Sequence, residues 1–141
     1  MWRNQSQPPV NKTTDNKTTN NMKSFRFFEW KVYKDSQCIF SKALKIVDLL
    51  PQRYRYDMGS QLLRSSLSIS LNIAEGCGKY SDKEFNRFIE ISLGSLYETV
   101  ACLDILRKEK FISSSCFDEV LILCDEVAKQ LGGFKKKLVK A

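Results

Sequence analysis

Histidine is absent from this chain of 141 residues. Because histidine is the commonest general base in enzymes, its absence excludes a Ser-His-Asp triad and a Cys-His nucleophile pair. Zinc also loses a usual ligand, and no two cysteines stand at CxxC spacing, so we expect neither a metal nor a cofactor. An odd number of irregularly spaced cysteines indicates reduced thiols in a cytoplasmic protein. These cysteines are Cys38, Cys77, Cys102, Cys116 and Cys124.

Long hydrophobic runs are also missing. No apolar stretch reaches the roughly 18 residues that a membrane-spanning helix needs, and the N-terminus lacks the apolar core of a signal peptide. Hydrophobic residues still make up 43% of the chain, which is typical of a globular protein with one core. The net charge of +7 is a mild excess, which suits an acidic partner such as RNA without requiring one.

The first 24 residues are polar and contain the sequence NKTT twice. Such a segment buries too little apolar surface to offset the entropy lost on ordering, so we predict a disordered N-terminal extension. Aromatic and aliphatic residues become frequent from Phe25 onwards. The sequence therefore predicts two parts: the extension, residues 1–24, and one folded domain, residues 25–141.

Four segments of the folded domain carry apolar residues at three- and four-residue spacing, the period of an amphipathic helix. The first ends at Pro51, which cannot continue a helix, and the third begins at a capping box formed by Ser81 and Glu84. Short connections between the segments favour neighbouring helices that run in opposite directions. The predicted fold class is therefore all-α, an antiparallel up-down-up-down four-helix bundle behind a disordered N-terminal extension.

Two stretches of these helices are ambiguous. Residues 67–73, LSISLNI, alternate apolar and polar side chains like a strand, but residues 57–77 are too long for one, so we favour two adjacent buried rows of a helix. Gly76 and Gly78 then act as the C-terminal stop of that helix. In the last segment, Gly132 and Gly133 cost about 1 kcal/mol each relative to alanine, which indicates either close packing or fraying.

A polar face follows the second helix, and a comparable face follows the third. One interpretation is two ordinary solvated surfaces. Another is a hydrogen-bond network between helices or subunits, with Arg64 or Arg87 paired to a glutamate of the other face. A third is a catalytic carboxylate pair, Glu75 with Glu98, although no metal-ligand motif accompanies it. The faces consist of Arg64, Ser68, Asn72 and Glu75 on the second helix and of Glu84, Arg87, Ile91, Gly94, Ser95 and Glu98 on the third.

The sequence NIAEG at residues 72–76 is followed by GK at 78–79, a capped helix start at Ser81 and KEF at 83–85. With QLLRSSLSI at 61–69, this pattern resembles four-helix-bundle proteins encoded within 23S ribosomal RNA intervening sequences. Accessory proteins of diversity-generating retroelements are similar to them. The resemblance covers the whole predicted bundle, and its motif residues are Arg64, Ser68, Asn72, Glu75, Gly76, Ser81, Glu84, Phe85, Phe88 and Glu98.

The resemblance implies a non-enzymatic bundle that assembles into a homopentameric barrel, with the motif residues serving fold and assembly. For the retroelement branch it implies binding of nucleic acid and of a reverse transcriptase. Two positions depart from the family pattern. Ser70 stands where the family often has proline, which puts a helix kink in doubt, and Leu63 replaces one of two consecutive arginines, which weakens a nucleic-acid contact there.

Our main functional prediction is a homo-oligomeric accessory protein that binds nucleic acid, RNA in particular, through contacts between cations and phosphates. The alternative is a protein-interaction scaffold of the ribosomal RNA intervening-sequence type without a direct nucleic-acid role. An enzyme acting through Glu75 or Cys77 is a third hypothesis, for which no substrate is indicated, and we expect no enzymatic activity. The predicted nucleic-acid-binding residues are Arg53, Arg55, Lys79, Lys135, Lys136, Lys137 and Lys140.

Overall fold

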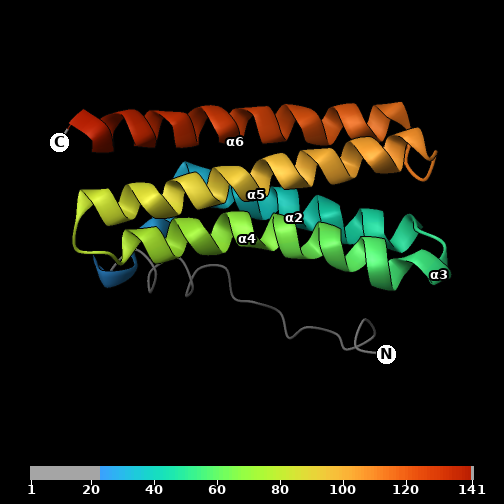
Figure 1. The fold of residues 1–141 in the computed structure, drawn as a ribbon, viewed down its shortest axis with the longest axis horizontal. Coiled ribbons are helices and arrows are strands. Elements are labelled where there is room, and N and C mark those ends of the chain that lie inside the picture. Colours follow the sequence, from blue (N-terminus) through green and yellow to red (C-terminus); the bar gives the residue numbers. More distant parts are fainter. Residues whose placement is uncertain (1–22, 141) are drawn as a thin grey trace, which may run out of the picture.

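The computed structural model describes residues 23–140, and over this range the chain is helical with no strand (Figure 1). The prediction of an all-helical chain is therefore confirmed for the described part. Most of the predicted disordered extension, residues 1–22, lies outside it. In chain order the elements are the 3-10 helix η2 (Lys23–Glu29), α2 (Lys31–Leu49), α3 (Gln52–Tyr54), the π-helix η3 (Arg55–Gly59), α4 (Ser60–Cys77), α5 (Asp82–Lys108) and α6 (Ser114–Lys140).

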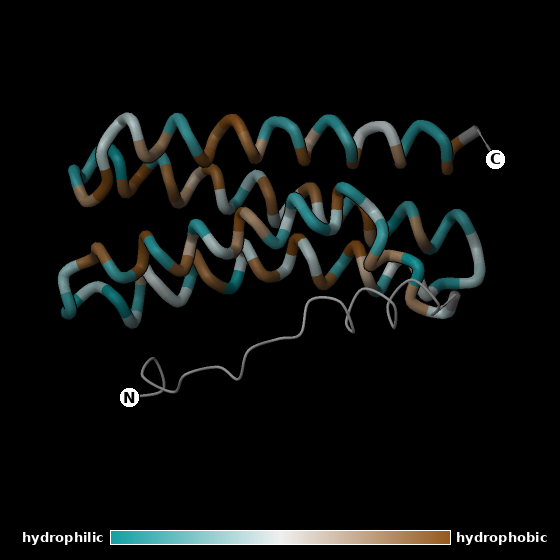
Figure 2. Tube along the Cα trace, turned by 180° about the vertical axis from the view of Figure 1, so that it is seen from behind, coloured by the Kyte–Doolittle hydropathy of each residue, from teal (hydrophilic) through white to brown (hydrophobic). Residues whose placement is uncertain are grey.

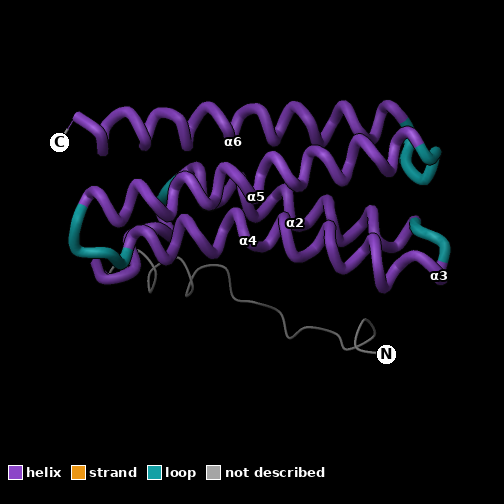
Figure 3. The backbone as a smooth tube through the Cα atoms, viewed as in Figure 1, coloured by secondary structure: helices purple, strands orange, loops and turns teal. Residues whose placement is uncertain are grey.

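Four long helices lie side by side, and their connections alternate between the two ends of the molecule (Figures 1 and 3). The α2–α4 and α5–α6 connections lie at one end, and the α4–α5 turn and the C-terminus of α6 lie at the other. Helix α4 packs against both α2 and α5, and α6 packs against α5 and α2. The α4–α5 pair makes the most extensive contact, so it forms the centre of the arrangement.

Hydrophobic positions recur along every long helix and form the shared core (Figure 2). The strand-like alternation of residues 67–73 is resolved as helix, because Ile69 and Ile73 are fully buried while Leu67 and Leu71 are 40% and 56% exposed. The predicted second buried row, which includes Leu67, is thus only partly buried. Completely buried hydrophobic side chains come from all four helices: Ile39, Leu62, Ile69, Ile73, Ile89, Val127 and Leu131.

Local signals place several helix ends correctly. Helix α2 stops just before Pro51, and the side-chain oxygen of Ser81 accepts a hydrogen bond from the Glu84 N–H at 3.1 Å at the start of α5. At the start of α6 the cap is Ser113, whose side chain accepts from the Cys116 N–H at 3.0 Å. The sequence between Pro51 and α4 is not an open connection but helix, since α3 and η3 lead directly into α4.

Gly132 and Gly133 do not interrupt α6, which continues through them to Lys140. A side chain added at either glycine would meet no described atom within 4 Å, so close packing does not explain them. Gly76 is different, because it is a buried residue inside α4 rather than part of a stop signal. A Cβ atom on Gly76 would lie 2.8 Å from Phe85 Cδ2 and 3.0 Å from Phe88 Cβ, so its missing side chain lets the end of α4 meet the start of α5.

We predict that Gly76→Ala lowers the free energy of unfolding by about 1–3 kcal/mol, because the added methyl group overlaps two phenylalanine side chains. Gly133→Ala is the matched control, since it adds the same methyl group to a helix with open space around it. That control should stabilise the protein by up to about 1 kcal/mol. Urea unfolding followed by circular dichroism gives both values, and equal responses of the two variants would contradict the close contact at Gly76.

Candidate functional site

The polar faces predicted on the second and third helices meet as a seam of hydroxyl groups between α4 and α5. The Ser68 and Ser95 hydroxyls are 2.8 Å apart, and the Thr99 hydroxyl donates to Ser65 Oγ at 2.9 Å. Further along, the Ser92 hydroxyl donates to the main-chain oxygen of Ile69 at 2.8 Å. We call these contacts the α4–α5 seam. Small side chains let the two backbones approach, and the hydroxyls satisfy one another away from water.

Asn72 of α4 stabilises this seam through its side-chain amide. Its side-chain nitrogen donates to the Ser68 main-chain oxygen at 2.8 Å and to the Ser68 hydroxyl at 2.9 Å. Because Ser68 in turn contacts Ser95, the amide of Asn72 helps to orient a hydroxyl that bridges two helices. This role accounts for an amide side chain between Ile69 and Ile73, the buried isoleucines of α4. On the other side of α4, the buried Ser70 hydroxyl lies 2.7 Å from that of Ser36 on α2.

The charged members of the two faces do not form the predicted cross-helix ion pairs within the described chain. Arg87 pairs with Glu84 on its own helix at 3.4 Å, and Glu98 accepts a hydrogen bond from Gln61 instead. Arg64 and Glu75 are exposed and have no ion-pair partner among residues 23–140. The hydrogen-bond interpretation therefore fits the hydroxyl and amide groups, whereas these two charged groups remain on the surface.

The proposed catalytic pair of Glu75 and Glu98 is wrong on geometry. Glu98 bonds to Gln61, which precedes Glu75 by nearly four turns of α4. At 1.5 Å per residue the two carboxylates lie on the order of 20 Å apart along the helix, too far to act on one substrate atom.

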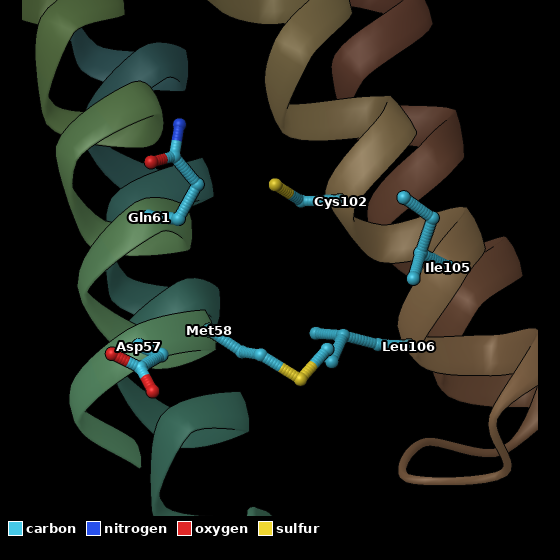
Figure 4. A pocket seen from close by; sticks show the side chains of 6 residues that line it. All are labelled: Asp57, Met58, Gln61, Cys102, Ile105 and Leu106. Carbon is cyan, nitrogen blue, oxygen red and sulfur yellow. The ribbon is translucent and has the colours of Figure 1, made fainter. Parts of the chain in front are cut away.

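A cavity of about 350 Å³ opens between η3, α4 and α5, next to the Gln61–Glu98 contact (Figure 4). The Met58 side chain reaches across toward Leu106, and the Cys102 sulfur points toward the opening. Burial, with a smaller contribution from Glu98, raises the pKa of the Cys102 thiol, so it stays protonated and is a poor nucleophile. Burial likewise raises the pKa of Cys124 to about 12. The cavity lining is Asp57, Met58, Gln61, Cys102, Ile105 and Leu106.

The predicted nucleic-acid-binding residues separate into two groups at opposite ends of the molecule (Figure 1). Arg53 and Arg55 lie in α3 and η3, whereas Lys79 lies in the α4–α5 turn, at the same end of the molecule as the last turns of α6. The side chain of Lys140 lies outside the described part. The predicted residues therefore do not form one continuous surface in this fold.

The arginines of the first group have local roles. The guanidinium of Arg55 donates to the main-chain oxygens of Leu50 at 2.9 Å and Asp48 at 3.1 Å, which satisfies carbonyls at the end of α2. Arg53 lies over the Tyr54 ring, 4.6 Å from its centroid. Arg55 is thus a capping residue, and sequence reasoning missed this because the contact depends on how η3 folds back against α2.

The second group gains members that the sequence prediction did not include. Lys79 and Arg87 both lie against the Phe88 ring, 4.9 and 4.8 Å from its centroid, and Lys83 stands one turn before Arg87 on α5. The run GKYSDKEFNR at residues 78–87 already contains these cations and could have signalled them. The last turns of α6 contact α5 in this region through an ion pair between Lys135 and Glu90 at 3.0 Å. We define the basic end as Lys79, Lys83, Arg87, Lys135, Lys136 and Lys137.

Neither a metal-binding cluster nor a membrane-crossing helix was found in the part of the chain that the structure describes.

The family model described as 23S rRNA-intervening sequence protein matches residues 29–133. A crystal structure of a protein of unknown function from the S23 ribosomal protein family of Bacteroides thetaiotaomicron matches with a TM-score of 0.70 and 24% identity. The match covers 74% of this chain and 98% of that one, and at this identity it shows the fold alone. No curated protein gave a match.

We predict that Thr99→Val lowers the free energy of unfolding by about 1–2 kcal/mol, because it keeps the shape but removes the hydroxyl that donates to Ser65. Ser65→Ala combined with Thr99→Val should cost clearly less than the sum of the two single changes, because each single change already removes the same hydroxyl–hydroxyl bond between the helices. Chemical unfolding of the four proteins of this double-mutant cycle gives the coupling energy. Additive losses would contradict an energetically coupled seam.

Proposed function

Because the chain belongs to the 23S rRNA-intervening sequence protein family, we propose that it is a non-enzymatic, homo-oligomeric accessory protein that binds nucleic acid through its basic end. We interpret the four long helices as an antiparallel up-down-up-down bundle and a homopentameric barrel as its assembled form. The observation that carries the proposal is the gathering of cations from the α4–α5 turn and the last turns of α6 at one end of the molecule.

Most cations of the basic end are available to a ligand. Lys79, Lys83, Lys136 and Lys137 are exposed, and none of them forms an ion pair with another described residue. Elsewhere, many lysines are paired along or between helices, as Lys31 is with Asp35 at 2.7 Å. Unpaired ammonium groups contact phosphates without reading base sequence, which supports binding that is sensitive to salt and tolerant of sequence.

Self-association is supported by the outer face of α4. Leu67 and Leu71 are exposed there, between Arg64 and Glu75, which lack ion-pair partners among the described residues. An exposed apolar patch flanked by charged groups is typical of a surface that another subunit covers. Assembly would also repeat the basic end in each subunit and so strengthen the electric field that attracts nucleic acid.

Two further parts of the proposal concern partner and compartment. A reverse transcriptase of a diversity-generating retroelement is the protein partner that the family resemblance favours, with RNA as the nucleic acid. The five cysteines are free, which suits the reducing cytoplasm. A protein scaffold without a nucleic-acid role is the alternative, and a partner that stays bound after nuclease treatment would favour it.

We predict that the affinity for a structured RNA falls steeply with salt, because binding releases counterions from the phosphates. Lys136→Glu with Lys137→Glu should weaken binding about tenfold or more and lower the slope of log affinity against log salt by about 2. The matched control, Lys45→Glu with Arg53→Glu, makes the same charge change away from the basic end and should weaken binding less. Fluorescence anisotropy over a salt series measures both.

The same samples provide the contradicting outcomes. Absent or salt-independent binding by the intact protein would overturn the nucleic-acid role, and equal losses in both double variants would overturn its location at the basic end. The mass in solution, measured by light scattering, tests assembly, and a monomer at all concentrations would contradict the homo-oligomer.

A further inference from the structure

Tyr80 is the most exposed large hydrophobic side chain among the described residues. It stands in the α4–α5 turn, and its relative exposure of 108% means that no neighbouring side chain covers its ring. The structure shows no hydrogen bond or ring contact from Tyr80 to another described residue. An aromatic ring that contributes nothing to the core is a large flat apolar surface presented to solvent.

The turn that carries Tyr80 is held firmly on both sides. The N–H groups of Gly78 and Lys79 donate to the main-chain oxygens of Glu75 and Gly76, each at 3.1 Å, and these bonds close the end of α4. Directly after Tyr80, the Ser81 hydroxyl caps α5. The close contact of Gly76 with Phe85 fixes one helix end against the other. The ring of Tyr80 is therefore presented from a turn that is already ordered, which lowers the entropy lost on binding.

Three cations surround the base of this turn. Lys79 and Arg87 share the Phe88 ring, and Lys83 lies one helical turn before Arg87 on α5. Arg87 forms an ion pair with Glu84 at 3.4 Å, and the exposed Asp82 begins α5, so Lys79 and Lys83 are the cations here without an ion-pair partner among the described residues. The arrangement is an exposed aromatic ring beside a group of phosphate-binding side chains, the combination that single-stranded nucleic acid requires.

We propose that Tyr80 is a stacking platform for an unpaired base of single-stranded nucleic acid, with the adjacent phosphates bound by Lys79 and Lys83. This inference rests on the proposed nucleic-acid function and names its substrate as single-stranded. In a duplex the bases are already stacked on one another, so an exposed ring gains nothing from it. Every base has a flat face, and stacking on Tyr80 therefore tolerates different sequences.

Tyr56, at the other end of the molecule, provides a contrast and a control. It is 83% exposed and follows Arg53 and Arg55. Arg55 donates to carbonyls at the end of α2, and Arg53 lies over Tyr54. Both tyrosines have an aspartate close by in the sequence, Asp57 directly after Tyr56 and Asp82 two residues after Tyr80. A highly exposed tyrosine whose adjacent arginine, Arg55, is bound to main-chain carbonyls thus separates ring exposure from the combination found at Tyr80.

The test compares binding of an unstructured oligouridine of about 12 nucleotides with binding of an RNA duplex of the same length, by fluorescence anisotropy of the full-length protein at fixed salt. We expect Tyr80→Ala to weaken binding of the single strand by about 5- to 150-fold, the effect of losing one stacked base. Duplex binding should change little. Tyr80→Phe should keep single-strand binding, and Tyr56→Ala should leave it unchanged. The salt slope of Tyr80→Ala should equal that of the wild type, because no phosphate contact is lost.

Each other outcome has a definite meaning. If the wild type binds neither RNA, the proposed nucleic-acid function itself fails. If the wild type binds in a salt-dependent way and Tyr80→Ala has no effect, or weakens single strand and duplex equally, only the stacking platform is overturned. If Tyr80→Ala leaves single-strand binding intact but abolishes binding of a purified reverse transcriptase, the ring is a protein contact and the inference is wrong.

Discussion

The close approach of α4 and α5 is the constraint on which the rest of the structure depends. It requires glycine at position 76, where any side chain would meet Phe85, and small hydroxyl residues along the seam. A larger residue in this contact would separate the two helices that form the most extensive packing in the molecule. The same contact fixes the α4–α5 turn and thereby places Lys79 beside Arg87 at the Phe88 ring.

Hydroxyl groups in a core are costly unless each finds a partner, and here the partners are carbonyls of the same helix as well as groups on the neighbouring helix. Sliding α5 along α4 by one turn would separate Ser68 from Ser95 and Thr99 from Ser65 at once. The seam therefore favours one register of the two helices, whereas hydrophobic side chains alone tolerate several. This accounts for serine and asparagine in the most apolar part of the sequence without any catalytic role, and it leaves Arg64 and Glu75 free on the outer surface.

Sequence patterns predicted those features that depend on neighbours along the chain. The end of α2 before Pro51, the cap at Ser81 and the helical nature of residues 67–73 all follow from local rules. Features that depend on how the chain turns and packs were beyond those rules: the capping of α2 by Arg55, and the separation of the predicted cations into two ends. Tyr80 was overlooked because a single sequence does not reveal whether an aromatic residue is buried or exposed.

Native-state hydrogen exchange tests most directly the claim that the α4–α5 seam organises the molecule. The account predicts that amides around Ile69, Ile73 and Ser92 exchange only through global unfolding, so that their opening free energies equal the value from urea unfolding. Amides near the ends of α6 should exchange through smaller openings. If the α4–α5 amides instead opened while α2 and α6 stayed protected, the seam would not be the most stable unit, and the account of a pre-ordered turn would be contradicted.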